Sequence, residues 1–205
     1  MIRAVVLAGA AILVFSLPAE ASKAKPHHNQ HHHIQNRRHS NRSRHHPGVF
    51  HMAKGWPKGL SIPLIGVHAH VEDIALNGPT DLHAPFKWGD VAWYDKSARP
   101  GALGHSFIFG HLDSYCCAAI FWKLKDLKRG DIIKVWYKKR VLKFRVRWQH
   151  TYPNTALPVK FMYDPTTQHG LLLITCAGAF HTDGTGYDHK LFVYARLILP
   201  NGRLG

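Results

Sequence analysis

The sequence predicts an all-β domain that closes into a barrel or packs as a sandwich. From Trp56 onward, short apolar runs are separated by Gly, Pro, Asn and Asp, which is typical of many short strands joined by turns. In residues 141–148, apolar side chains alternate with Lys and Arg, as in a strand with one buried and one solvated face. Helical periodicity is nearly absent, so a small barrel or sandwich is the expected architecture.

The expected strands follow one another at short intervals. In chain order they are residues 61–65, 91–94, 106–109, 132–137, 141–148, 171–175 and 191–199. The fourth and fifth flank Lys138-Lys139-Arg140 and form a predicted hairpin. One short helix is expected over residues 118–127, because Phe121 and Leu124 fall near one face before Gly130 ends the segment.

Residues 1–21 read as an export signal. A basic start precedes an apolar run that ends in Ala19-Glu20-Ala21, an Ala-x-Ala cleavage pattern. The run is shorter than the roughly 20 residues of a membrane-spanning helix, so cleavage is expected, with a retained N-terminal anchor as the alternative. Either way, the rest of the chain is expected outside the cytoplasm, tethered at the cell surface or secreted.

Residues 22–54 are rich in His, Arg, Asn and Pro and contain no acid, which predicts a disordered linker before a folded domain of residues 55–205. The net charge of +15 suits an anionic surface, and export argues against nucleic acid as the partner. The linker histidines are possible metal ligands, but they lack fixed spacing and carboxylates. A solvated spacer is therefore favoured, with no metal site and no cofactor.

The chain contains three cysteines, an odd number that leaves at least one thiol unpaired in an exported protein. Residues 171–176 form an apolar run that places Cys176 at a strand end, and residues 107–111 place His111 in the same way. A cysteine nucleophile needs a neighbouring imidazole, which also protonates a departing amine. The pair predicts cysteine catalysis, although a packed core thiol and a backbone-bonded loop histidine remain the alternatives.

The order of several motifs resembles the sortase family. Leu173-Ile174-Thr175-Cys176 is similar to the TLxTC signature of sortases, with Leu172 in place of its first Thr, and Gly110-His111-Leu112-Asp113 is similar to their GHxD. Residues 62–67 resemble the IPxIGV of the opening strand, and residues 193–195 resemble the closing strand. The resemblance covers about residues 60–199 and is greatest to class F. It implies a closed eight-stranded barrel with short helical or 3-10 connections, and a catalytic domain of residues 55–205.

The third catalytic residue of the family departs from its pattern. Sortases place an arginine near the start of the last strand, whereas residues 187–192 contain none. Lys190 is the expected replacement, since Arg196 lies about 20 Å further along the strand; His189 is a second possible donor. Lysine supplies a point charge but not the bidentate fork of arginine, so weaker stabilisation of an oxyanion is expected.

The resemblance implies a transpeptidase. Cys176 would attack a backbone carbonyl in a sorting motif of the LPxTG kind, carried by secreted proteins, and an amine of a peptidoglycan precursor or a pilin would resolve the thioester. One alternative is a non-catalytic exported β-barrel binding module with a His-rich metal- or polymer-binding arm. An L,D-transpeptidase is a second alternative, but its Ser-x-Gly-Cys motif is absent from residues 173–178.

Two further features of the histidine loop carry expectations. Cys116 and Cys117 are adjacent, and the ring that such a pair closes is strained, so we expect two small, unpaired and partly buried loop residues. A bridge from either one to Cys176 would silence the nucleophile. Asp113 is close enough in sequence to orient His111, but a surface carboxylate in a turn is favoured.

Overall fold

The computed structural model describes residues 55–74 and 85–205. The predicted signal or anchor of residues 1–21 and the predicted linker of residues 22–54 lie outside the described residues. Within the described ranges, no helix combines the length and the apolar character that crossing a membrane requires.

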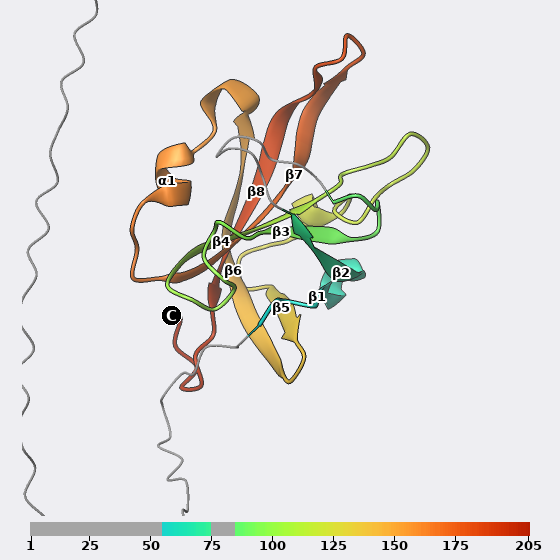
Figure 1. Ribbon diagram of the computed structural model, residues 1–205. Helices are drawn as coiled ribbons and strands as arrows, with labels where there is room; N and C mark the ends of the chain where they lie inside the picture. The colour runs from blue at the N-terminus through green and yellow to red at the C-terminus, as the bar shows by residue number, and fades with distance from the viewer. Residues whose placement is uncertain (1–54, 75–84) are drawn as a thin grey trace, which may run out of the picture. The chain divides into compact units, whose positions relative to one another are not determined.

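The chain forms a closed barrel of eight strands, which confirms the predicted fold class (Figure 1). The order around the barrel is β1-β2-β3-β4-β7-β8-β6-β5. The strands are β1 (Gly59–Ile62), β2 (Val67–Ile74), β3 (Val91–Tyr94), β4 (Gly104–Gly110), β5 (Ile132–Tyr137), β6 (Arg140–Pro153), β7 (His169–His181) and β8 (Gly186–Leu197). Two pairings, β2 with β3 and β4 with β7, are parallel, and the others are antiparallel.

The connections contain short helical and 3-10 elements, as the resemblance implies. Three of them contain the 3-10 turns η1 (Pro63–Ile65), η2 (Leu124–Asp126) and η3 (Asn154–Ala156), and one contains the helix α1 (Val159–Tyr163), which the sequence did not predict. The predicted strand over residues 61–65 is divided between β1 and η1. Pro63 has no N–H to continue a ladder, and Gly66 adopts a left-handed φ of 73° that turns the chain into β2.

The predicted helix over residues 118–127 is wrong, because only Leu124–Asp126 is helical, as a 3-10 turn. Phe121, Leu124 and Leu127 are fully buried, and their spacing of three residues suits a 3-10 turn rather than an α-helix. The preceding backbone is also occupied elsewhere: the N–H of Phe121 donates to the carbonyl of His111 (2.9 Å), and the N–H of Ala119 donates to that of Leu112 (3.0 Å).

The strands bury two separate apolar clusters. The first fills the barrel and includes Ile108, Leu171, Leu173 and Val193. The second lies on the opposite face of β4, β7 and β8 and includes Phe107, Phe109, Leu172, Ile174, Phe192 and Tyr194, with Met162 of α1 packed on them. This sheet is therefore covered on both faces, which explains why residues 171–174 form a continuous apolar run instead of alternating.

His105, near the start of β4, packs against the second cluster. It is 7% exposed, its ring contacts Phe161 at a centroid distance of 4.6 Å, and its Nδ1 lies 2.9 Å from the carbonyl oxygen of Phe161. Burial lowers the pKa of His105 below its ordinary value of 6.5, since the charged ring loses solvation. His105 is thus a packing residue at the far end of the strand from His111.

This burial predicts a pH dependence of stability. Below pH 6.5 the unfolded chain is protonated at His105, whereas the folded chain remains neutral there until the pH approaches the lowered pKa. The unfolded chain binds more protons in this range, so the free energy of unfolding decreases as the pH falls. His105→Gln should show a smaller decrease between pH 7.5 and pH 5 in urea unfolding than the wild type. His68→Gln, at an exposed position, should keep the wild-type slope; equal slopes in all three proteins would contradict the assignment.

Candidate active site

Three neighbouring strands end in a row of polar side chains. In β4, β7 and β8 the register aligns Phe109 with Ile174 and Ile174 with Phe192. Two residues further on, the same face carries Cys176 opposite Lys190, and His111 directly follows the last residue of β4, Gly110. Because side chains alternate between the faces of a sheet, all three polar residues lie on the face of the second cluster. The register thus brings together the three residues that the sequence singled out.

Cys176 and Lys190 are in direct contact. The Nζ of Lys190 lies 3.3 Å from the Sγ of Cys176, as the donor of a hydrogen bond. Cys176 is a free thiol and is partly exposed. Just beyond it, Gly178 adopts a φ of 83° where the register with β8 shifts between Ala177 and Phe180. This bulge ends the regular pairing immediately after the thiol and leaves the sulfur accessible.

The other two candidate donors, His189 and Arg196, bind other partners. His189 is aligned with Ala177, one residue out of the row, and its Nδ1 lies 2.7 Å from Oδ1 of Asp188. This hydrogen bond is the main reason that the pKa of Asp188 lies below its usual range. Arg196 is aligned with Gly170, six positions from Cys176, and its Nε donates to the oxygen of Gly205 at 2.8 Å. Lys190 is therefore the cation beside the sulfur.

His111 is oriented by the loop before β3 rather than by Asp113. Its Nε2 lies 2.7 Å from the carbonyl oxygen of Pro85, and its ring packs on Trp88 at a centroid distance of 4.1 Å. A carbonyl oxygen only accepts, so Nε2 carries the proton in this bond and Nδ1 is left for chemistry in the pocket. The carboxylate of Glu72 in β2 fixes the loop by accepting from the backbone N–H groups of Phe86 (2.8 Å) and Lys87 (3.3 Å).

Two buried contacts fix the end of β4 beneath His111. The hydroxyl of Thr175 donates to the carbonyl of Gly110 at 2.8 Å and ties β4 to β7 one residue before Cys176. A Cβ at Gly110 would lie 2.5 Å from the ring of Phe121, so only glycine leaves room for this fully buried side chain. The histidine therefore follows a position whose backbone is held on two sides.

The row opens into a pocket of about 670 Å³. Its wall includes Cys176, His111, Lys190, Trp88, Asp113, Ser114, Tyr115, Asn154, Phe180 and Tyr187. The hydroxyl of Tyr187 donates to Asp113, and this bond raises the pKa of Tyr187 to about 12. The amide of Asn154 donates to the carbonyl of Tyr187 at 2.6 Å. Asp113 therefore links the histidine loop to β8, and Phe180, 62% exposed, is an aromatic surface on the rim.

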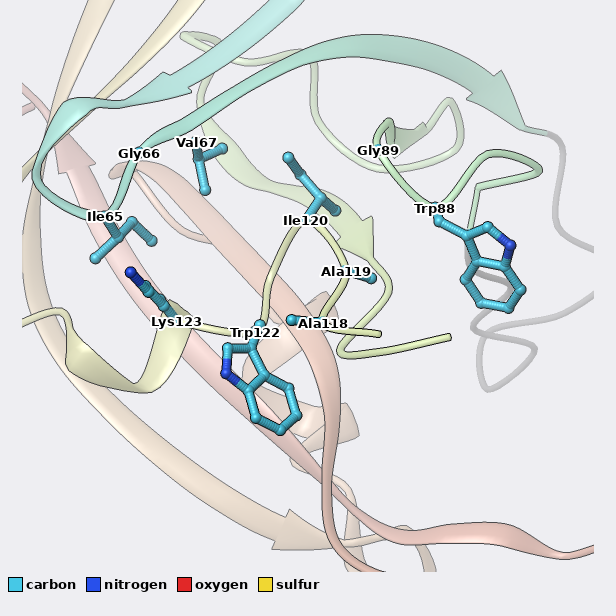
Figure 2. Close-up of a pocket in the computed structure, with 10 residues that line it drawn as sticks. All are labelled: Ile65, Gly66, Val67, Trp88, Gly89, Ala118, Ala119, Ile120, Trp122 and Lys123. Atoms are coloured by element: carbon cyan, nitrogen blue, oxygen red, sulfur yellow. The ribbon is translucent and has the colours of Figure 1, made fainter. Parts of the chain in front are cut away.

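A smaller pocket of about 390 Å³ adjoins the first and shares Trp88 with it. Figure 2 shows its apolar side chains, among them Ile65, Val67, Ile120 and Trp122. It contains no nucleophile and no acid, and Lys123 is its single charged residue. Its structural role is clear from the backbone: the N–H of Ile120 donates to the carbonyl of Trp88 at 3.1 Å, which supports the indole against His111.

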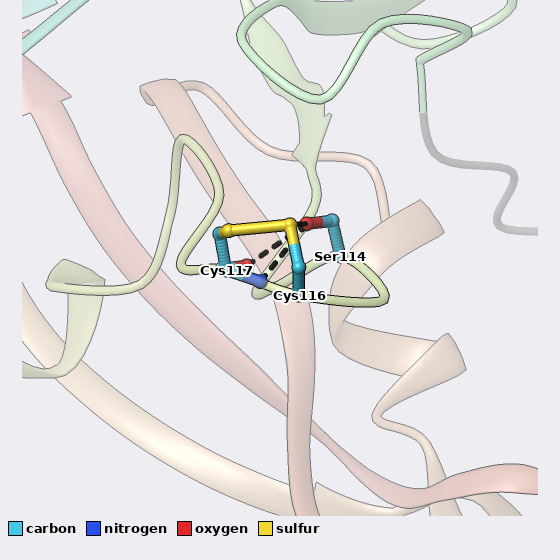
Figure 3. Close-up of a disulfide and its surroundings, with 3 residues drawn as sticks. All are labelled: Ser114, Cys116 and Cys117. Atoms are coloured by element: carbon cyan, nitrogen blue, oxygen red, sulfur yellow. Dashed lines mark hydrogen bonds between the residues drawn. A yellow bond between two sulfur atoms is a disulfide. The ribbon is translucent and has the colours of Figure 1, made fainter.

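The expectation for Cys116 and Cys117 is wrong, because the two residues form a disulfide with each other (Figure 3). The turn around them accommodates the small ring: the N–H of Cys117 donates to the hydroxyl of Ser114 (3.2 Å), which donates to the carbonyl of Cys117 (3.1 Å). Both cysteines are exposed rather than partly buried. Cys176 is consequently the one free thiol in the described part of the chain.

Glu72, Trp88, Asn154 and Tyr187 were not predicted as site residues. Asn154 and Tyr187 reach the pocket through the pairing of β6 with β8, a long-range relation that no local motif encodes. The sequence gives only a weak indication that Trp88 belongs to the site, since it is an aromatic residue within a loop. Among the described residues, no group of three or more His, Cys, Asp or Glu side chains is arranged to hold a metal ion.

A family model described as the sortase domain matches residues 60–198. The chain belongs to the sortase family. A search of the curated proteins found no match.

Solved structures of sortases share the fold. Sortase A from Corynebacterium diphtheriae has a TM-score of 0.54 at 23% identity, covering 70% of this chain and 61% of that one. Sortase C2 of pilus island 1 from group B Streptococcus has a TM-score of 0.52 at 23% identity, with 68% and 72% covered. Sortase C-1 from Actinomyces oris has a TM-score of 0.52 at 22% identity, with 68% and 72% covered. The chain thus spans about three fifths of the length of the Corynebacterium enzyme.

The contact with Pro85 predicts the tautomer of His111. Because Nε2 faces a carbonyl oxygen, the neutral ring should carry its proton on Nε2 and leave Nδ1 unprotonated. Long-range ¹H–¹⁵N NMR of the neutral ring distinguishes the two tautomers, and His111→Gln identifies the resonances by their loss. A neutral ring protonated on Nδ1 would show that Pro85 does not orient this histidine.

Proposed function

We propose that the protein is an extracytoplasmic cysteine transpeptidase. It cleaves a C-terminal sorting motif of the LPxTG kind and transfers the cleaved protein to an amine. The observation that carries the proposal is the row of Cys176, His111 and Lys190 around one pocket, with the lysine ammonium 3.3 Å from the sulfur. Membership of the sortase family and the fold shared with sortases A and C support a transpeptidase over other cysteine enzymes.

In the first step, the Sγ of Cys176 attacks the carbonyl carbon of the motif after its proton has passed to His111. The carbonyl oxygen becomes an oxyanion, and Lys190 is the cation beside the sulfur that neutralises it. His111 returns the proton to the departing amine as the C–N bond breaks, and Nδ1 is the atom free to do so. A thioester on Cys176 and a free amine result.

In the second step, an acceptor amine resolves the thioester. His111 removes a proton from the amine, the new C–N bond forms, and the thiolate of Cys176 leaves. We propose that the acceptor is an amine of a peptidoglycan precursor or a lysine of a pilin. Both proposed steps use only the side chains of Cys176, His111 and Lys190.

The motif class and the location rest on the sequence. The opening-strand, GHxD-like and TLxTC-like segments occur in the order found in class F sortases, and we propose that the protein belongs to this class. The export pattern of residues 1–21 supports an enzyme outside the cytoplasm, tethered by this segment or released by its cleavage. Secreted proteins bearing the sorting motif would encounter it there.

A peptide panel tests the proposed function. Fluorogenic peptides of the form Leu-Pro-X-Thr-Gly are incubated with the full-length protein, with and without glycinamide, and the products are resolved by mass spectrometry. The wild type should cleave the peptides and form the amide product. Cys176→Ala should retain at most about one thousandth of the activity, since the nucleophile is gone, while the double variant Cys116→Ser/Cys117→Ser should still cleave. Cleavage that survives Cys176→Ala would favour the binding-module alternative.

The lysine makes a separate prediction. Lys190→Gln removes the cation beside the sulfur and should lower kcat/KM by about 10²- to 10³-fold, as the loss of one oxyanion donor does. Lys190→Arg should keep most of the activity, because arginine supplies the charge together with two parallel donors. Lys160→Gln, at an exposed position, is the matched control. An unchanged kcat/KM in Lys190→Gln would exclude the lysine from the reaction.

A further inference from the structure

The outer face of the β5–β6 hairpin is basic and free of acids. Residues 132–163 contain no Asp or Glu. The alternate side chains Ile133, Val135, Leu142 and Phe144 are buried in the barrel, so the intervening side chains face outward. We call Lys134, Lys138, Lys139, Lys143 and Arg145 the basic face. On one side β5 pairs with β1, whose sequence GLSI also lacks an acid.

This arrangement places like charges against each other. Lys134 and Lys143 are directly opposite in the antiparallel register of β5 and β6. Like charges in this position are destabilising, and a neighbouring acid would ordinarily relieve them. The sequence of both strands supplies none. An external anionic surface is the partner whose charge complements the basic face.

The tip of the same hairpin adds exposed apolar groups. Trp136 and Val141 are aligned across the two strands and are 39% and 40% exposed. Between them the turn carries Lys138, Lys139 and Arg140. Tryptophan prefers the boundary between lipid headgroups and acyl chains, and basic clusters bind anionic headgroups. A soluble polyanion would bind the cations but has no apolar layer in which the exposed indole is buried. The combination of cations and an exposed indole therefore favours a lipid surface.

The chain enters the barrel beside this hairpin. Gly59 is aligned with Trp136, and the N–H of Lys58 donates to the carbonyl of Trp136 at 2.7 Å. The preceding polypeptide is therefore joined to the domain next to the basic face. In sequence that polypeptide consists of the acid-free residues 22–54 and the apolar segment of residues 1–21. In the alternative in which residues 1–21 are retained as an anchor, this anchor joins the domain next to the basic face.

We propose that the basic face docks the domain on an anionic phospholipid surface, with Trp136 and Val141 in the headgroup layer. This docking fixes the direction in which the pocket faces. Lys190 is aligned with Tyr152, and twelve residues of β6, or about 40 Å of strand, separate Tyr152 from Arg140 in the hairpin. In Figure 1 the β5–β6 and β7–β8 hairpins project from opposite ends of the barrel. The pocket beside β7 and β8 therefore opens away from the lipid.

Vesicle co-sedimentation of the full-length protein tests the proposal. Vesicles of phosphatidylcholine alone are compared with vesicles that contain 30% phosphatidylglycerol, at several salt concentrations. Each basic residue near an anionic bilayer contributes about fivefold to partitioning, so Lys138→Gln/Lys139→Gln should weaken binding to the anionic vesicles by roughly 20- to 30-fold. The exposed pair Lys96→Gln/Lys160→Gln is the matched control and should bind like the wild type. Residues 1–54 are the same in all variants, so differences report the hairpin.

A third variant separates a lipid surface from free phosphate. Trp136→Ser leaves the charge unchanged and should weaken binding to anionic vesicles while leaving binding to soluble inorganic polyphosphate unaffected. The proposal is overturned if Lys138→Gln/Lys139→Gln binds anionic vesicles as the control pair does. It is also overturned if Trp136→Ser binds them as the wild type does, which would indicate a soluble polyanion as the partner. Circular dichroism melting of each variant confirms that it is folded.

Discussion

The register between the parallel strands β4 and β7 is the constraint on which the site depends. It aligns Phe109 with Ile174, so that His111 and Cys176 emerge at the same level, and the antiparallel β8 places Lys190 on the other side of the thiol. A slip of one residue would turn each side chain to the opposite face of the sheet. The hydrogen bond from Thr175 to Gly110, with the apolar clusters on both faces, opposes such a slip.

The strands fix where the three residues lie, and the loops fix how they are oriented. Pro85 and Trp88 hold the ring of His111, and Glu72 holds the loop that carries them. The bond between Asp113 and Tyr187 joins the histidine loop to β8 across the pocket. Residues 187–192 contain no arginine, and the single ammonium of Lys190 reaches the sulfur from the adjacent strand. Lysine supplies a point charge without the two parallel donors of an arginine side chain.

Much of this arrangement could be predicted from the sequence, because it follows from local patterns. The alternation in β6, the apolar runs of β4 and β7 and the strand-end positions of His111 and Cys176 are short-range signals. The orientation of His111 could not be predicted, since Pro85 lies 26 residues away and contacts it only in the folded barrel. The helix predicted over residues 118–127 failed because its backbone donors are taken by the histidine loop, and the disulfide of Cys116 and Cys117 depends on a turn that the sequence does not reveal.

In the proposed function, Cys176 carries the acyl group. The most direct measurement is intact-protein mass spectrometry. The protein is incubated briefly with a Leu-Pro-X-Thr-Gly peptide, the reaction is stopped with acid, and the adduct is located by peptide mapping. We expect a mass increase that corresponds to the acyl group of the N-terminal fragment, located on the peptide that contains Cys176 and released by hydroxylamine. Cleavage of the substrate with no adduct on Cys176, or with the adduct on another residue, would contradict it.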